Sequence, residues 1–265
     1  MKMMKTIKEY DNNNRITGNK PKITNSKINF LGENNLLICE DNVKLTNSEI
    51  TFNGNDSIIY LSSNKNDYHL SVTINNESVL YIDENCYFND KLYLILSETK
   101  NIIIGKECLF SFSTWVRLAD PHLIYNSRNL KRINLSKSVY IGDHVWIGQD
   151  VLILKGTTIG SGSIIGAKSV IANKKIPSNT IWGGNPAKEI KKNIFFDGRN
   201  VHKYTKTNTE QSMKATNKYG VYKRDKTNIK IKDLEAKLET SNFKEKINIL
   251  IDLRKDTNHN RFYIR

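Results

Sequence analysis

The sequence predicts an all-β solenoid that ends in a short α-helical extension. The first observation is an isoleucine at every sixth position from Ile141 to Ile171, with glycine directly after four of them. Neither an α-helix nor an ordinary β-strand repeats every six residues, whereas a solenoid with short straight faces does. The other two observations are a weaker copy of the same spacing nearer the N-terminus and two amphipathic segments near the C-terminus.

The regular coils are expected to span residues 102–182. Each six-residue unit is read as one short strand and one corner, and its isoleucine points inward to stack on the equivalent residue of the neighbouring coil. Glycine permits a tight corner, and a small or β-branched residue such as Val145 fills the narrow interior. Three units would close one triangular coil. Several coils are required, because each buries its apolar row only against the next.

Before residue 100 we expect irregular coils of the same solenoid.

The regular spacing is interrupted once. It continues through Ile104, Phe110 and Val116 to His122, and then it breaks until Val139. The intervening segment is therefore predicted to be a loop that leaves the coil. Long excursions from a rigid scaffold often carry function.

We divide the chain into a solenoid domain, residues 1–197, and a basic extension, residues 198–265. Within the extension, residues 198–228 are polar and expected to be extended. Apolar residues recur at helical spacing near 231–239 and 242–255. We expect these helices to dock on the solenoid, rather than to pair between subunits or lie on a membrane.

Composition limits the classes of protein that this chain can represent. Among 265 residues, 41 Lys and Arg outnumber 27 Asp and Glu, which gives a net charge of +14. No apolar run approaches the roughly 18 residues of a membrane span, and the polar N-terminus lacks the apolar core of a secretory signal. Three cysteines without a Cys-x-x-Cys pair favour a reducing compartment and argue against a disulfide framework. We therefore expect a cytoplasmic protein, whose basic charge either attracts an acidic polymer or lipid or only aids solubility.

Three motifs resemble one family. Segments 141–156, 159–171 and 183–188 begin Ile-Gly-Asp-His-Val-Trp, Ile-Gly-Ser-Gly-Ser-Ile and Gly-Gly-Asn-Pro-Ala-Lys. They resemble the hexapeptide-repeat acyltransferases over about residues 102–196. Within that family the chain looks most like bacterial capsular polysaccharide and polysialic acid O-acetyltransferases, through Asp120-Pro-His122, the context of Trp146 and the Asn-rich early coils. The resemblance implies a left-handed parallel β-helix, a homotrimer and acetyl-CoA as co-substrate, with no metal.

The resemblance makes His122 the candidate catalytic base. Attack by a sugar hydroxyl on a thioester requires removal of a proton, and a neutral imidazole can accept one near pH 7. Trp146 is the second candidate, as a wall for the acceptor or the thioester arm, although packing against a neighbouring subunit is an equal alternative. A role for Asp120 in orienting the imidazole stays open. His144 is interpreted as surface structure.

The coenzyme site is expected along the late coils, where the family lays the pantetheine arm between two subunits. Small residues let that arm approach the backbone, and lysines can neutralise phosphates. The residues implicated are Gly148, Ser163, Gly166, Ala167, Lys168, Gly183, Asn185, Pro186 and Lys188.

The function predicted is O-acetylation of a capsular or surface polysaccharide, including one that contains sialic acid. Two alternatives are an N-acetyltransferase acting on an amino sugar and a non-catalytic, glycan-binding solenoid, because fold alone does not dictate function. A zinc enzyme on this scaffold is disfavoured, since Gln149 stands where a second histidine would be required. Nucleic-acid binding is also disfavoured, because no recognised module is present. The basic extension could contact an anionic glycan, the inner membrane or the capsule assembly machinery.

Overall fold

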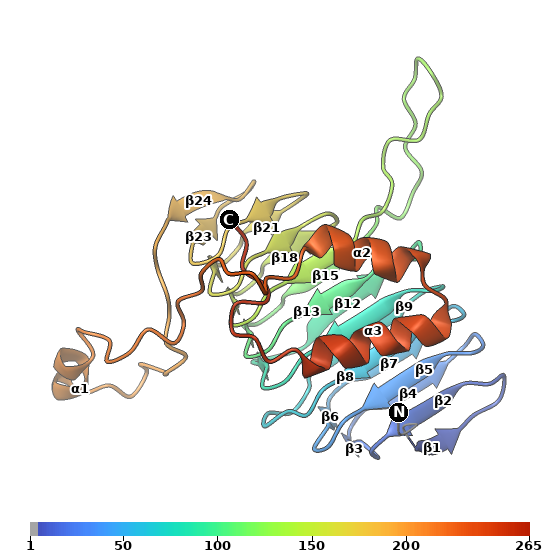
Figure 1. Ribbon diagram of the computed structural model, residues 1–265, viewed down its shortest axis with the longest axis horizontal. Coiled ribbons are helices and arrows are strands. Elements are labelled where there is room, and N and C mark those ends of the chain that lie inside the picture. Colours follow the sequence, from blue (N-terminus) through green and yellow to red (C-terminus); the bar gives the residue numbers. More distant parts are fainter. Residues whose placement is uncertain (1–4) are drawn as a thin grey trace.

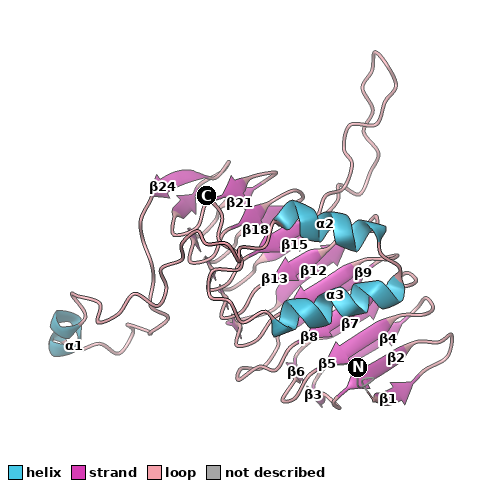
Figure 2. Ribbon diagram, viewed as in Figure 1, coloured by secondary structure: helices cyan, strands magenta, loops and turns pink. Residues whose placement is uncertain are grey.

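The computed structural model describes residues 5–265 and forms a parallel β-solenoid of about seven turns with three helices (Figure 1). The predicted all-β solenoid with a helical extension is therefore confirmed. Figure 2 shows short strands stacked along the whole solenoid, with helices only in the last part of the chain. None of the helices in residues 5–265 is long and apolar enough to cross a membrane.

Each coil visits three faces in turn, and strands on one face pair in parallel with the coil above and below. Face 1 contains, in spatial order, β1 (Thr6–Glu9), β2 (Arg15–Gly18), β5 (Leu36–Cys39), β8 (Ile58–Leu61), β10 (Val79–Ile82), β13 (Ile102–Ile104), β16 (Val139–Ile141), β19 (Thr158–Ile159) and β22 (Lys175–Ile176). Only the end pair β1 and β2 is antiparallel on this face.

Face 2 follows face 1 along the chain. It contains β11 (Tyr87–Phe88), β14 (Leu109–Phe110), β17 (Trp146–Ile147), β20 (Ile164–Ile165), β23 (Ile181–Gly183) and the antiparallel end strand β24 (Lys188–Lys191). In the first coils this position is taken by the pair β3 (Lys22–Thr24) and β6 (Lys44–Thr46).

Face 3 closes each coil. Its strands are β4 (Lys27–Phe30), β7 (Glu49–Phe52), β9 (Leu70–Ile74), β12 (Leu92–Leu96), β15 (Trp115–Arg117), β18 (Leu152–Leu154) and β21 (Val170–Ile171).

The core is a set of stacked apolar columns, as the six-residue period predicts. On face 1, Ile141 is in register with Ile104 below it and Ile159 above it, and all three are at most 1% exposed. On face 3, Ile153 pairs with Ile171 in the same way, and both are fully buried. Each isoleucine therefore removes its side chain from water only because an equivalent residue lies directly above or below it.

The early coils are longer than the late ones and turn their corners with asparagine. Leu37 is in register with Ile59, whereas Ile141 is in register with Ile159, so an early coil holds about four more residues. The extra residues widen the corners, many of which hold asparagine with positive φ, a conformation that asparagine tolerates well. Corner asparagines of successive coils bond to each other, for example Asn25 Nδ2 to Asn47 Oδ1 at 2.7 Å.

Face 1 is covered on its outer side by two helices of the basic extension. Helices α2 (Ile231–Thr240) and α3 (Phe243–Lys255) lie across its strands (Figure 1). Leu238 and Leu250 are fully buried there, in one cluster with outward-facing residues of face 1 such as Tyr81. The expected docking of the helices on the solenoid is thus observed, and it explains why the strands of face 1 are apolar on both sides.

Cations of the docked helices bond to the solenoid beneath them. The Arg254 guanidinium donates from Nε to Glu40 at 2.9 Å and from Nη2 to Glu84 at 2.8 Å. Lys246 Nζ donates to the backbone carbonyl of Glu77 at 2.8 Å, with only 7% of the residue exposed. Part of the positive charge of the extension therefore serves to attach it to the solenoid.

Two segments project from this body (Figure 1). The first is the loop that follows β15, in the place where the sequence predicts a loop. The second includes the short helix α1 (Lys206–Gln211), which has no buried residue. Apart from α1, residues 198–228 have no helix or strand, close to the extended segment expected.

Candidate active site

His122 stands where the chain leaves face 3. Strand β15 ends at Arg117, and the next residue that rejoins a strand is Val139 of β16. Between them the chain forms a hairpin-like excursion in which Tyr125 and Arg132 form an isolated antiparallel bridge. His122 itself is exposed and lies outside the coil interior. Its imidazole is therefore accessible to a substrate.

Hydrogen bonds from Asn134 and Lys155 fix the backbone around His122. The amide of Asn134, a residue only 6% exposed, donates from Nδ2 to the His122 carbonyl at 2.7 Å and to Asp120 Oδ2 at 3.3 Å. Lys155 reaches from the next coil to the same Asp120 oxygen and to the Asn134 carbonyl. The hydrogen bond from Lys155 holds the pKa of Asp120 below its usual value. Asp120 thus bonds to Lys155 and Asn134, and it acts on the loop rather than on the imidazole.

Asn134 and Lys155 were missed in the sequence. Asn134 lies in the segment that breaks the period, and Lys155 occupies a corner where the repeat accepts many residues. One signal could have identified Asn134. A loop that leaves the coil needs hydrogen-bond partners for its backbone groups, and an asparagine amide within the loop can supply them. That signal is weak in a chain with abundant asparagine.

The returning strand of the loop is anchored to an early corner. Arg132 donates two hydrogen bonds to the Glu98 carboxylate, from Nη1 to Oε1 at 2.5 Å and from Nη2 to Oε2 at 2.9 Å. The Ser136 hydroxyl donates to the same carboxylate. These bonds, led by that from Arg132, lower the pKa of Glu98 to about 2. The loop is consequently held at both of its ends.

Trp146 lies on β17 and points outward from face 2, with 41% of its surface exposed. Its ring is 6.0 Å from that of Phe196, measured between centroids. His144, two residues earlier, is only 9% exposed, because its ring stacks on Phe196 at 4.0 Å. Its Nε2 is 3.1 Å from the Phe196 carbonyl. The His144 ring is therefore packed against Phe196 rather than exposed on the surface, where we expected it.

The glycines of the late corners fall into two kinds. A Cβ atom added at Gly148 would come within 2.6 Å of the Ala167 backbone nitrogen, so coil stacking alone requires glycine there. A Cβ added at Gly166 would meet nothing nearer than the Trp182 carbonyl at 3.5 Å, which is ordinary contact. An alanine would therefore fit at Gly166, so coil stacking does not by itself require glycine there.

The remaining candidates for the coenzyme divide by exposure. Ala167 and Lys168 are exposed at the corner after β20, and the Lys168 Nζ pairs with Asp150 at 3.1 Å. Ser163 is different: it is fully buried, and its hydroxyl donates to the Pro177 carbonyl at 2.7 Å. We correct its assignment to the solenoid interior, because the fifth position of a repeat points inward.

The last candidates lie in the turn between β23 and β24 or in the strand residues that flank it, Gly183 and Lys188. Gly183 is half-buried, whereas Asn185, Pro186 and Lys188 are exposed. The turn is fastened to β21, because Val170 donates its backbone N–H to the Gly184 carbonyl at 3.1 Å. This attachment places the turn one coil beyond Gly166 on the same corner.

One chain does not bring all of these residues together. His122 follows the carboxyl end of a face 3 strand, whereas the Gly166 corner precedes the amino end of face 3 strands. Trp146 faces outward from face 2. The candidate base therefore lies at a different corner of the three-sided prism from Gly166, whereas Trp146 pairs with Ile164, two residues before Gly166.

Comparisons with known proteins show which repeat and which structures this chain resembles. Residues 138–173 match the family model described as bacterial transferase hexapeptide (six repeats). The polysialic-acid-specific acetyltransferase NeuO has a similar structure, with a TM-score of 0.65 and 29% identity over 77% of this chain and 88% of that chain. The polysialic acid O-acetyltransferase OatWY has a TM-score of 0.55 and 26% identity over 74% of this chain and 97% of that chain.

The chain is an acyltransferase that carries the transferase hexapeptide repeat in residues 138–173 and is similar in structure to these two acetyltransferases. Its solenoid is the left-handed parallel β-helix expected from the resemblance. A galactoside acetyltransferase in complex with coenzyme A matches this acyltransferase over 44% of this chain and 56% of that chain, with 26% identity and a TM-score of 0.34. No curated protein matches its sequence.

Proposed function

We propose that this acyltransferase moves an acetyl group from acetyl-CoA to a hydroxyl of a capsular or surface polysaccharide that contains sialic acid. The observation that carries the proposal is the exposed His122, held at a loop exit by Asn134 on a fold similar to that of two polysialic acid acetyltransferases.

In the proposed reaction His122 is the general base. The imidazole takes the proton of the sugar hydroxyl as the hydroxyl oxygen forms a bond to the thioester carbonyl carbon. The carbon–sulfur bond then breaks, and the imidazolium returns the proton to the departing thiolate. A positioned base of this kind contributes roughly 10²- to 10⁴-fold. The Asn134 bond to the His122 carbonyl supports this role, because it fixes the backbone that carries the base.

A homotrimer would join the separated parts of the site. Two of the three faces carry outward apolar rows that the chain itself leaves uncovered. On face 3, Tyr93 and Trp115 stack at 4.2 Å with an angle of 7°, and on face 2 Tyr87 and Trp146 are more than 40% exposed. The loop also exposes large apolar residues, namely Leu123, Ile124, Tyr125, Leu130, Ile133 and Leu135. Such exposed apolar surface favours protein–protein contact.

The late corner fits the thioester arm of a coenzyme. Gly166 leaves space at its backbone, and exposed Lys168 and Lys188 flank it with positive charge. In the assembly we propose, the loop of one subunit carries His122 to the Gly166 corner of its neighbour, with Trp146 forming part of the wall. The exposed Asn185 and Pro186 would lie toward the nucleotide end. Capsule biosynthesis in the cytoplasm is the setting that we propose for this activity.

The test is a transfer assay with purified protein and acetyl-CoA. We would measure thiol release with sialylated polymer, with a neutral glucan of equal length and with an amino sugar. We expect release to depend on the sialylated acceptor and the product to be an ester cleaved by hydroxylamine. An alkali-stable amide would favour the N-acetyltransferase alternative, and release that no acceptor stimulates would contradict the proposal.

A further inference from the structure

Positive charge is concentrated on the projecting segment, residues 199–218, which we call the arm. It contains five Lys and Arg residues and one acid, Glu210. Within residues 5–265, the side chains of Lys203, Lys214 and Lys218 form no ion pair. The docked helices differ, because Arg254 and Lys246 are bonded to the solenoid. The arm therefore carries a net charge of +4 on 20 residues, and three of its lysines are available to a ligand.

Both roots of the arm are fixed next to the candidate active site. At its start, Phe196 stacks on His144 and contacts Trp146. At its end, the Tyr219 hydroxyl donates to the Glu107 carboxylate at 3.1 Å. The arm therefore leaves the body beside the outward face of Trp146, although its tip is exposed (Figure 1).

A cavity of about 300 Å³ lies between the two roots. It combines aromatic rings, a carboxylate, an amide and a hydroxyl, supplied mainly by His144, Phe196, Asp197, Thr216, Asn217 and Tyr219. Rings that cover the apolar face of a sugar, next to groups that bond its hydroxyls, are suited to one carbohydrate residue. The volume is at the small end of ligand pockets, about 300–1,000 Å³.

We propose that the arm and the cavity at its root form an acidic-glycan subsite next to Trp146, which holds polymer residues beyond the one that is acetylated. The cavity would take one sugar ring, and Lys203, Lys214 and Lys218 would attract the carboxylates of neighbouring residues. The inference rests on the proposed function for its acceptor class. It reassigns polymer attraction from the whole basic extension to the arm.

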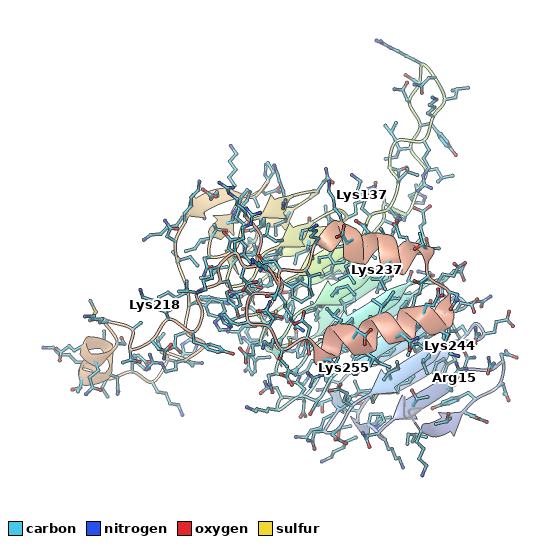
Figure 3. All side chains as sticks on the ribbon, in the orientation of Figure 1. Arg15, Lys137, Lys218, Lys237, Lys244 and Lys255 are labelled. Carbon is cyan, nitrogen blue, oxygen red and sulfur yellow. The ribbon has the colours of Figure 1, made fainter. Side chains whose placement is uncertain are left out.

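The test compares two triple variants with the same loss of charge. The arm variant is Lys203→Gln/Lys214→Gln/Lys218→Gln, and the control is Lys237→Gln/Lys244→Gln/Lys255→Gln on the docked helices. Figure 3 labels Lys218 at the end of the arm and the three control lysines on α2 and α3. Binding of polysialic acid is measured by titration without acetyl-CoA, so that the readout does not require turnover.

We expect the arm variant to weaken polymer binding about tenfold at low salt, and the control to change it less than about twofold. In the transfer assay, KM for polymer should rise in the arm variant while kcat/KM for a sialic acid dimer stays unchanged. Ala215→Trp, which places a bulky ring at the cavity wall, should weaken dimer and polymer binding together. Equal effects of the two triple variants would overturn the proposal.

Other outcomes separate this inference from the proposed function. Single-stranded DNA of the same charge binding as tightly as polysialic acid would overturn the glycan assignment. A change in oligomeric state in the arm variant, measured by light scattering, would overturn it in favour of a subunit contact. If polymer binds through the arm but no sialylated acceptor is acetylated, the proposed function fails and the subsite stands.

Discussion

The Arg261 guanidinium donates two hydrogen bonds to the Asp143 carboxylate, from Nε to Oδ2 at 2.9 Å and from Nη2 to Oδ1 at 2.8 Å. The same guanidinium bonds to Asp83 and to the carbonyls of Leu253 and Asp256, and it is only 1% exposed. Two corner carboxylates of the solenoid are thus neutralised by a residue near the end of the chain. The C-terminal segment is an integral part of the solenoid rather than a separate appendage.

Replacing this arginine should strongly destabilise the fold. Arg261→Gln leaves the buried Asp143 without its cation and leaves the buried Asp83 with only Arg254, whose Nε is 3.9 Å from Asp83 Oδ1. Loss of one partner of a buried ion pair typically costs about 3–5 kcal/mol. We expect a decrease of that size in the free energy of unfolding in urea. Arg265→Gln, at an exposed position, is the control and should change it by less than about 0.5 kcal/mol. A loss below about 1 kcal/mol for Arg261→Gln would contradict the interpretation.

Removing the proposed base should abolish turnover without affecting the fold. His122→Ala is expected to lower kcat about 10²- to 10⁴-fold, because the acceptor hydroxyl keeps its proton. The exposed side chain makes no packing contribution, so the unfolding temperature and acetyl-CoA binding should not change. His69→Ala removes an imidazole from an early coil and should retain full kcat. Unaltered acetylation by His122→Ala would exclude this residue as the base.

Removing the hydrogen bonds of Asn134 should reduce kcat while leaving the His122 imidazole in place. Asn134→Leu deletes the bonds to the His122 carbonyl and to Asp120, and it also frees the Ile124 N–H. A displaced imidazole is poorly aligned with the acceptor hydroxyl, so we expect kcat to fall about tenfold or more. The pH profile of kcat should keep its shape, because the titrating group is still present. Asn129→Leu at the exposed loop tip is the control. If both variants have the same kcat, Asn134 has only a structural role.

The ion pair between Arg132 of the loop and Glu98 predicts a specific pH dependence of the stability of the fold. The Arg132 bond lowers the pKa of Glu98 from 4.5 to about 2 in the folded chain. A lowered folded-state pKa stabilises the fold above the unfolded value, and this stabilisation is lost as pH falls from about 4.5 to about 2. The difference in unfolding temperature between the parent and Glu98→Gln should therefore be largest above pH 5. It should shrink steadily toward pH 2.5, and a constant difference across this range would argue against the anchor.

Two glycine substitutions should have opposite effects. Gly166→Ala has room for its methyl group, so the fold should persist while KM for acetyl-CoA rises about tenfold, because the methyl group narrows the proposed cleft. Gly148→Ala would press on the Ala167 backbone and should instead lower the unfolding temperature. Thermal unfolding and coenzyme titration of both variants make the comparison. A Gly166→Ala enzyme with unchanged KM would remove this corner from the coenzyme site.

The sequence by itself determined the solenoid. The six-residue series of buried isoleucines that includes Ile141, Ile147 and Ile153 has one physical explanation, because only stacked coils bury a side chain every six residues. The loop after β15 was likewise visible, as an interruption of a strict period. His122 could be singled out because a motif surrounds it.

Tertiary structure decided what the period does not encode. Contacts between residues far apart in the chain, such as Asn134 with His122 across the loop or Arg261 with Asp143, depend on where non-repeating segments return. Nothing in their spacing along the sequence distinguishes them from solvated polar residues. Ser163 illustrates the reverse: a residue taken for a ligand contact is turned inward, because the fifth position of each coil faces the core.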